Sequence, residues 1–403
     1  MSTTAAVEFD PFSDEYFNDP TEVYRRLRDE VPVSFNERYG FYALSRFADV
    51  VTAHRDWQGF SSAHGVDLNS LTKDPELIKS FRSIIMMDPP EHDRLRALVS
   101  RVFTPRAVSA LEPMIREVIT EVLEPIEAAR EFDAVRDFSA HFPIEIISRM
   151  LGVPEGERRG IRERIDLSLH REPGQLDPTP EGMQAMAESA AYFSELAGEK
   201  RKHPGDDMMS RLTQVTVDRG DGVETGLDDL EIAGFASLLG GAGAETVMKL
   251  VGNAVVLFSH HPAQWQTILD DRAKVPNAVE EILRYLPPSQ YQGRFSVADR
   301  EFDGGTIPAG FPVLLLTGAA TRDPRAFERA DEFDIDRPPS VAIGFGHGVH
   351  SCLGAALARM ESRIAIEELA ARWRRLDVDD TGLRRVHMSN VAGYSNVPVR
   401  VTR

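Results

Sequence analysis

Cysteine and basic charge are both scarce in this chain. Its 403 residues include one cysteine, Cys352. A single cysteine excludes an intramolecular disulfide and is typical of a reducing compartment, so we expect a cytoplasmic protein. The 46 Lys and Arg residues are outnumbered by 64 Asp and Glu, which gives a formal net charge of −18. Nucleic-acid binding needs a basic surface to contact phosphates, so we expect no nucleic-acid partner.

Long hydrophobic runs are also missing. No stretch of 18 consecutive apolar residues occurs, and residues 1–12 lack the basic and apolar regions of a signal peptide. We therefore expect no membrane anchor. Hydrophobic residues make up 42% of the chain, which is enough for a sizeable core and excludes a disordered protein. Length alone suggests about two or three domains.

The one cysteine lies in a glycine-rich stretch, FGHGVHSCLG, at residues 345–354. An alanine-rich run at residues 355–373 follows and is predicted to be helical, with one apolar face formed by Leu353, Leu357, Met360 and Ile364. The first backbone N–H groups of a helix are unpaired and its dipole is positive there, and both effects favour a thiolate over a thiol. We expect a sulfur anion held by a tight loop, which suits a metal ligand or a nucleophile.

Residues 345–354 match the haem-ligand loop Phe-Gly-x-Gly-x-His-x-Cys-x-Gly at all six fixed positions, and the chain resembles the cytochrome P450 family. The resemblance implies that the Cys352 thiolate is the axial ligand of haem b. It also places Phe345, Gly346, His350 and Gly354 in the haem-binding loop. An isolated cysteine is most often inert and buried, but the complete loop argues against that interpretation.

A second motif lies in a predicted long helix at residues 227–259, which at 1.5 Å per residue is roughly 50 Å long. Residues 240–246 read GGAGAET. Three glycines in a helix cost roughly 1 kcal/mol each, so close approach of a bulky ligand explains them better than helix propensity. The segment resembles the family's oxygen-activation motif, which implies catalytic proton delivery by Thr246 and Glu245 and haem contacts at Ala242 and Gly243. A kinked core helix with a polar patch is the alternative.

Two cationic side chains, His92 and Arg96, lie four residues apart on a predicted helix, next to apolar residues. Such a pair suits an anion attached to a flat apolar body, although alone it is more typical of a solvated helix face. In the family, these positions bind haem propionates. The resemblance gives the same role to Arg294 and His350.

Glu281 and Arg284 form the Glu-x-x-Arg pattern of the family, whose role there is structural. The spacing itself carries little information, because Glu22 and Arg25 repeat it. What singles out Glu281 and Arg284 is their position between the long helix and the cysteine loop. The resemblance implies a third partner from the segment that leads to the cysteine, and Arg337 is the candidate.

These motifs follow the family order along nearly the whole chain. We therefore expect a single cytochrome P450 domain over residues 1–403. Its fold class is mainly α, a cytochrome P450-type fold that is helix-rich with small β-sheets near the N- and C-terminal parts of the chain. The predicted substrate pocket is apolar with several hydrogen-bonding groups, from Phe235, Leu238, Leu239, Gln290, Tyr291 and Tyr394. A lipid, steroid, terpene or polyketide-like substrate would suit it.

The resemblance implies a bacterial haem-thiolate monooxygenase that inserts one O atom from O2 into a C–H bond of a hydrophobic small molecule. The chain shows no flavin or iron–sulfur motif, so a separate ferredoxin and ferredoxin reductase would supply the electrons. Candidate residues for ferredoxin docking are Arg101, Arg359 and Arg363.

Three other functions stay open at this point. A peroxide-driven haem-thiolate peroxygenase has less need of Glu245 and Thr246, because peroxide brings its own protons. A haem-binding sensor or carrier would not turn over. A cysteine hydrolase using Cys352 with His347 or His350 would leave the glycine-bearing helix without a role.

Overall fold

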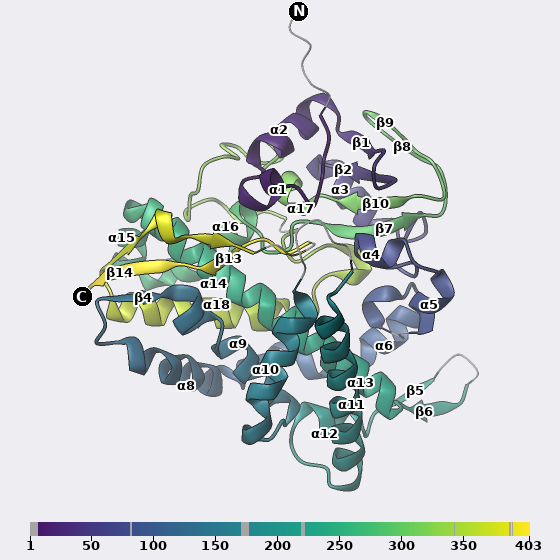
Figure 1. The fold of residues 1–403 in the computed structure, drawn as a ribbon, viewed down its shortest axis with the longest axis horizontal. Coiled ribbons are helices and arrows are strands. Elements are labelled where there is room, and N and C mark those ends of the chain that lie inside the picture. Colours follow the sequence, from purple (N-terminus) through teal and green to yellow (C-terminus); the bar gives the residue numbers. More distant parts are fainter. Residues whose placement is uncertain are drawn as a thin grey trace, which may run out of the picture.

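Helices dominate the computed structural model, which describes residues 7–80, 83–170, 177–218, 222–341, 343–386, 388 and 390–403. Strands are confined to small sheets beside the helical body (Figure 1). The prediction of a mainly α fold with small sheets is thereby confirmed. The larger sheet combines strands from the N-terminal part of the chain with strands from residues 292–315.

That larger sheet has the strand order β1-β2-β10-β7-β3. Its strands are β1 (Val33–Asn36), β2 (Phe41–Leu44), β3 (Phe60–Ser61), β7 (Gln292–Ser296) and β10 (Pro312–Leu315). Strand β10 runs parallel to β2, with Leu314 opposite Ala43, and the other pairs are antiparallel. Both Leu314 and Ala43 are buried. Because β10 also pairs with β7, the pairing of β10 with β2 fixes where β7 lies in the fold.

A second sheet, of order β11-β14-β4, joins β11 (Arg375–Val378), β14 (Pro398–Thr402) and β4 (Glu131–Asp133). Next to it, β12 (Arg384–Arg385) pairs with β13 (Tyr394–Asn396), and the register shifts between Arg384 and Arg385. Residues 387 and 389 of the C-terminal segment lie outside the described residues. The C-terminal part of the chain is thus tied to β4, far back in the sequence.

The long helix predicted at residues 227–259 consists of three consecutive elements, α13 (Asp229–Leu238), a π-helical segment η5 (Leu239–Gly243) and α14 (Ala244–His260). It begins with a capping box, in which the Asp228 side chain accepts from the Glu231 N–H and Glu231 accepts from that of Asp228. It ends before Pro262, which cannot continue the hydrogen-bond pattern. The π-helical segment covers three of the motif's glycines, where helix propensity is weakest.

This long helix is also apolar enough to cross a membrane. In the part of the chain that the structure describes, residues 229–260 pass that test on length and hydropathy, but 72% of the most apolar 18-residue window is buried within the protein. Its apolar residues are therefore used in packing against other helices.

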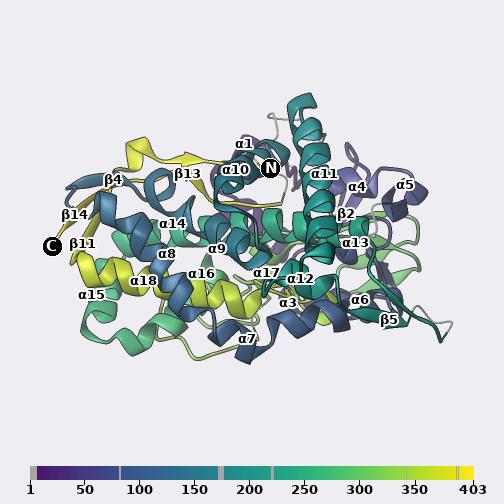
Figure 2. The ribbon, with the colours of Figure 1, turned by 90° about the horizontal axis from the view of Figure 1, so that it is seen from below.

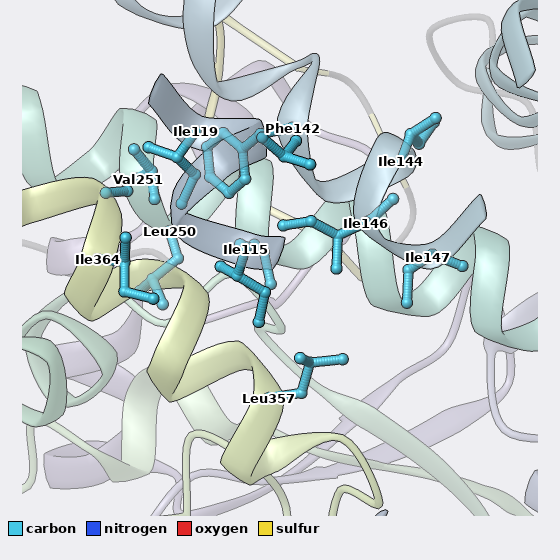
Figure 3. Close-up of a cluster of buried hydrophobic side chains, with 14 of the residues drawn as sticks. Ile115, Ile119, Phe142, Ile144, Ile146, Ile147, Leu250, Val251, Leu357 and Ile364 are labelled. Carbon is cyan, nitrogen blue, oxygen red and sulfur yellow. The ribbon is translucent and has the colours of Figure 1, made fainter. Parts of the chain in front are cut away.

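The main hydrophobic core surrounds α14 and contains side chains of α8 (Glu112–Leu123), α9 (Phe142–Leu151) and α18 (Ala355–Arg372). Helices α14 and α18 lie side by side in both views (Figures 1 and 2). Figure 3 shows this packing, with Ile115, Ile119, Phe142, Leu250, Val251 and Ile364 gathered together. We infer one domain over residues 1–403, because this cluster draws on residues from Ile84 to Val401.

Two helices cover the N-terminal half of the long helix. Helix α10 (Glu155–Leu169) packs against α11 (Pro180–Lys202) and η5, and α11 packs against α13. In Figure 2, α11 stands upright next to α13. The loop between α10 and α11 includes residues 171–176, which lie outside the described residues. Helix α10 also places Asp166 near enough to Glu245 of the long helix to raise the pKa of Glu245.

Glu281, on α16 (Val275–Tyr285), is the acceptor in a buried ionic cluster. Its carboxylate accepts from Arg284 Nε at 2.7 Å and Nη2 at 2.8 Å, from Arg337 Nε at 3.1 Å and from the Asp334 N–H at 2.9 Å. All three ionic side chains are less than 10% exposed. Arg337 is therefore the third partner that the resemblance implies, and the cluster ties α16 to the segment that leads to Cys352.

We predict that Glu281→Gln lowers the free energy of unfolding by about 3–5 kcal/mol, because it leaves two buried guanidinium groups without a counter-ion. Urea denaturation of the purified protein measures this loss. The matched control is Glu22→Gln, since Glu22 and Arg25 have the same spacing but side chains that are 62% and 49% exposed. The control is expected to have no measurable effect. Equal effects of the two substitutions would contradict a structural role for the buried cluster.

Candidate active site

A cavity of about 290 Å³ lies between α6 (Glu91–Val99), the long helix and the loop at residues 344–354. The long helix contributes six of the predicted residues to its lining, which are Phe235, Leu238, Leu239, Ala242, Gly243 and Thr246. From the other segments come His92, Arg96, Phe345, Gly346, His350, Cys352 and Gly354. The fold thus brings residues more than 250 positions apart to one cavity.

The loop before α18 is closed by its own backbone. The Cys352 N–H donates to the Phe345 carbonyl at 2.8 Å. Gly346 and Gly348 have φ of +69° and +71°, a region that favours glycine. A Cβ on Gly348 would collide with the carbonyl oxygen of His54 on α3 (Phe47–Arg55), so the loop lies directly on that helix. This packing turns the Cys352 side chain toward the cavity.

The Cys352 thiol is accessible from the cavity but lies deep within the protein. Burial raises the pKa of this thiol, and the Gly354 N–H, Arg96 and Arg359 oppose that effect only in part. The backbone N–H at the helix start favours the thiolate, as the sequence predicts, and desolvation opposes it. A bound metal cation would add to the stabilisation, because metal coordination deprotonates a thiol outright.

One end of the cavity gathers cationic and N–H donor groups that lack acceptors. The rings of His92 and His350 lie 4.3 Å apart, and each has a buried Nε2 with no partner in the described chain. Burial lowers the pKa of His350 to about 3, with Arg294 and His92 adding to the shift. Burial also lowers the pKa of Arg294, on β7, to about 10. Arg294 does not line the cavity itself and donates to the Gly293 carbonyl at 2.7 Å.

These groups fit the haem that the resemblance implies. Buried donors without acceptors are costly, and two carboxylates at this end would satisfy the donors of His92, His350 and Arg294. Arg96 points to the same end of the cavity and donates to the Ser351 carbonyl at 2.6 Å. The remaining wall is largely apolar, and Cys352 supplies a sulfur ligand for the iron.

Thr246 lines the cavity at the start of α14. Its Oγ1 donates to the Ala242 carbonyl at 2.8 Å, the backward bond that bends helices. Two of the glycines that precede Thr246 lie against side chains of neighbouring helices. A Cβ on Gly240 would lie 3.0 Å from Ile165 of α10, and one on Gly243 would lie 3.4 Å from Ile147 of α9. The expectation that a bulky ligand explains these glycines is thus wrong for Gly240, which accommodates a neighbouring helix.

Glu245, next to Thr246, does not line the cavity. Its side chain is 9% exposed, and its Oε1 lies 2.9 Å from the Nζ of Lys249 one turn later. Burial raises the pKa of Glu245, and the Lys249 ammonium opposes this shift. Successive helix residues point about 100° apart, so a motif of adjacent acid and alcohol places them on different faces.

Three residues predicted to line the substrate pocket lie elsewhere. Gln290 accepts from the Tyr24 hydroxyl at 3.1 Å and donates to the Pro287 carbonyl at 2.6 Å. Tyr291 is fully buried in the cluster formed with the N-terminal helices. Tyr394 is buried, and the Arg385 guanidinium lies 4.3 Å from its ring centre. These partners come from distant or flanking segments, so the local sequence did not reveal them. Ser289 and Gln292, which belong to the same predicted pocket segment, do line the cavity.

Sequence reasoning missed two buried polar residues near the cavity. Glu361 on α18 lines the cavity, and its Oε2 has no partner within the described residues. Burial raises the pKa of the Glu361 carboxyl well above its usual range. The sequence does contain a signal for Glu361, because it is a lone acid four residues after Leu357, on the predicted apolar face of the helix. Neither ring nitrogen of His54, on α3, has a hydrogen-bond partner within the described residues, and burial lowers the pKa of His54 to about 3. No sequence signal marks it.

Comparison with known proteins agrees with this geometry. A family model described as Cytochrome P450 matches residues 266–381. The putative cytochrome P450 123 of Mycobacterium tuberculosis is 40% identical over 393 residues, which cover 97% of this chain and 96% of that protein. The erythromycin C-12 hydroxylase of Saccharopolyspora erythraea is 36% identical over 382 residues, which cover 93% of this chain and 92% of the hydroxylase.

Solved structures show the same relationship. Cytochrome P450 CYP109Q5 from Chondromyces apiculatus is 32% identical, with 98% of both chains covered and a TM-score of 0.88. CYP109E1 from Bacillus megaterium, in complex with corticosterone, is 32% identical, with 96% of this chain and 99% of that chain covered and a TM-score of 0.84. Because the identity extends over almost the whole length, the chain belongs to the cytochrome P450 family of haem-thiolate monooxygenases, in which a cysteine, here Cys352, ligates the haem iron.

Proposed function

We propose that this monooxygenase inserts one atom of O2 into a C–H bond of a bulky hydrophobic small molecule in the cytoplasm. The observation that carries the proposal is that one apolar cavity is lined both by Cys352 and by Thr246 of the glycine-bearing helix. The first is a sulfur ligand for iron, and the second is a hydroxyl group that can hold a proton. A cavity with both groups supports oxidation better than simple haem storage.

Bound haem supplies the redox chemistry that activates O2, and a thiolate ligand favours O–O cleavage. The chain's own residues bind and orient the haem and move protons. His92, Arg96, Arg294 and His350 are the residues that would hold its carboxylates. Thr246 Oγ1 would release its proton into the cavity and be reprotonated from Glu245. The apolar walls keep bulk water from competing for these protons.

The cavity walls support a hydrophobic substrate with a small number of oxygen substituents. The long helix and the segment before α6 contribute the apolar residues Phe235, Leu238, Leu239, Ile84 and Ile85. Ser289 and Gln292 add hydrogen-bonding groups on one side. The corticosterone bound to CYP109E1 and the name of the erythromycin hydroxylase are consistent with such a molecule. A charged or strongly polar substrate would leave its groups without partners here.

We propose a separate ferredoxin and ferredoxin reductase as the electron donors. The candidate docking residues differ in their surroundings. Arg359 pairs with Glu280, and Arg363 pairs with Glu112 and Glu367. Arg101 is exposed near the start of the short helical segment Ser100–Phe103, which follows α6. An acidic partner would therefore meet less positive charge at Arg359 and Arg363 than the sequence suggests, which makes Arg101 the stronger candidate.

A ligand screen that follows the haem absorption band, and then turnover with isotope-labelled O2, tests the proposed function. Hydrophobic compounds that shift the band define the substrate class. With a reconstituted ferredoxin system, we expect one labelled oxygen atom in the product. Product that takes its oxygen only from added peroxide would indicate the peroxygenase alternative. Compounds that bind without any product would indicate the sensor or carrier.

We predict that Thr246→Ala keeps O2 consumption but lowers the product formed per O2 by roughly tenfold or more, because a proton-holding group is lost. Thr246→Ser, which keeps the hydroxyl, is expected to restore most of the yield. Thr267→Ala is the matched control, since Thr267 makes the same backward bond to the Ala263 carbonyl on another helix. A Thr246→Ala protein with the wild-type yield would rule out the proton-holding role.

We predict that Arg294→Met speeds haem loss about tenfold, because a hydrogen bond between charged groups contributes roughly 1.5–3 kcal/mol. Haem transfer to apomyoglobin measures this rate. Arg300→Met is the control, since Arg300 lies near β7 in sequence but pairs with Asp56. If the two variants lose haem at the same rate, Arg294 does not hold the haem carboxylates.

A further inference from the structure

Three side chains form a hydrogen-bonded chain at one wall of the cavity. Thr317, at the start of α17 (Thr317–Ala320), is fully buried, and its Oγ1 donates to Gln292 Oε1 at 2.6 Å. Nε2 of Gln292, on β7, donates to Ser289 Oγ at 2.8 Å. Gln292 and Ser289 line the cavity, and Thr317 does not. The chain therefore runs from the protein core to the cavity.

The direction of this chain decides which group Ser289 offers. A glutamine amide accepts through its oxygen and donates through its nitrogen. Burial lowers the pKa of His54 to about 3, and the Gln292 side chain opposes this shift, as a nearby amide oxygen does by favouring the protonated ring. The oxygen of Gln292 therefore faces Thr317 and His54, and its nitrogen faces Ser289. The Ser289 oxygen receives a hydrogen bond, and its own O–H remains a donor.

The backbone around Ser289 is held by the C-terminal segment of the chain. Ser289 and Val391 form an isolated antiparallel bridge. The Ala392 N–H donates to the Pro288 carbonyl at 2.8 Å. Within the described residues, Ser289 Oγ takes part in one hydrogen bond, in which it accepts from Gln292. Ser289 is thus fixed in position and keeps a free donor.

The apolar walls of the cavity give the Ser289 O–H no acceptor. Ile84, Ile85, Phe235 and Leu238 line the cavity with it. A hydrophobic ligand that fills the cavity would displace water from the hydroxyl, and an unpaired donor costs free energy. A carbonyl oxygen on the ligand accepts this bond and removes that cost. A ligand hydroxyl also accepts it but adds a second donor, which needs a partner of its own.

We propose that Ser289 is a specificity-determining residue whose hydroxyl donates to a carbonyl oxygen of the substrate. This narrows the substrate to bulky hydrophobic molecules that carry a ketone or ester carbonyl. A saturated hydrocarbon of the same shape fits the apolar walls but leaves the Ser289 hydroxyl unpaired. The inference rests on the proposed oxidation of a hydrophobic molecule in this cavity.

The test compares cyclododecanone with cyclododecane, which lacks the carbonyl, as ligands of the haem-loaded protein. A titration that follows the haem absorption band gives the Kd of each ligand, and infrared spectroscopy records the carbonyl stretch of the bound ketone. Ser289→Ala is expected to weaken ketone binding about 2- to 10-fold, as loss of one neutral hydrogen bond does, and to raise the stretching frequency. Cyclododecane should bind the variant at least as tightly as the wild type.

Two further variants test the donor and its direction. Ser289→Thr keeps the hydroxyl and is expected to keep the ketone affinity and the carbonyl frequency of the wild type. Gln292→Met removes the N–H that occupies the Ser289 oxygen, so the hydroxyl can also accept. Cyclododecanol is then expected to gain affinity relative to cyclododecanone by about 2- to 10-fold.

Equal carbonyl frequencies in the wild type and Ser289→Ala, or an equal loss of affinity for the ketone and the hydrocarbon, would overturn the role of Ser289. The hydrophobic substrate would stand in that case, because cyclododecane still binds. An unchanged ratio of alcohol to ketone affinity in Gln292→Met would overturn the direction of the chain on which the proposal depends. If neither ring compound shifts the haem band of the wild type, the proposed hydrophobic substrate fails together with this inference.

Discussion

The structure depends on one constraint, which is that a tight backbone loop must carry the chain's sole thiol into an apolar cavity. Two left-handed glycines and the bond from the Cys352 N–H to the Phe345 carbonyl close this loop. Contact between Gly348 and α3 fixes it from behind. The buried cluster around Glu281 anchors the segment that precedes it. The surrounding fold therefore positions one sulfur atom with little freedom.

Burial dominates the electrostatics of the cavity. It raises the pKa of Cys352 and Glu361 and lowers that of His350, so the charged form of each group is less favourable here than in water. Burial also lowers the pKa of Arg294, and the Asp88 carboxylate opposes this shift. The protein alone therefore leaves several polar groups unsatisfied. Haem would satisfy them with its metal and two carboxylates, which couples cofactor binding to the stability of the fold.

The sequence predicted the parts of the site that are local. The loop around Cys352, the Gly-Gly-Ala-Gly-Ala-Glu-Thr motif and the Glu281–Arg284 pair have fixed spacing, and each lies within ten consecutive residues. The residues whose environment the sequence predicted wrongly pack against distant parts of the chain. Tyr291 packs against N-terminal helices, and Gly240 accommodates Ile165 of α10. The backbone N–H at the start of α18 follows from the local sequence, whereas the desolvation that opposes it at Cys352 depends on tertiary burial. The pairing of Lys249 with Glu245 follows helical spacing, but the burial of both side chains does not.

The central claim is that Cys352 ligates the haem iron as a thiolate. The most direct measurement is the absorption spectrum of the reduced, haem-loaded protein under carbon monoxide, recorded for the wild type and for Cys352→Ser. The account predicts the strongly red-shifted band of thiolate-ligated haem in the wild type and its loss in the variant. A wild-type protein without that band, or a variant that keeps it unchanged, would contradict the account.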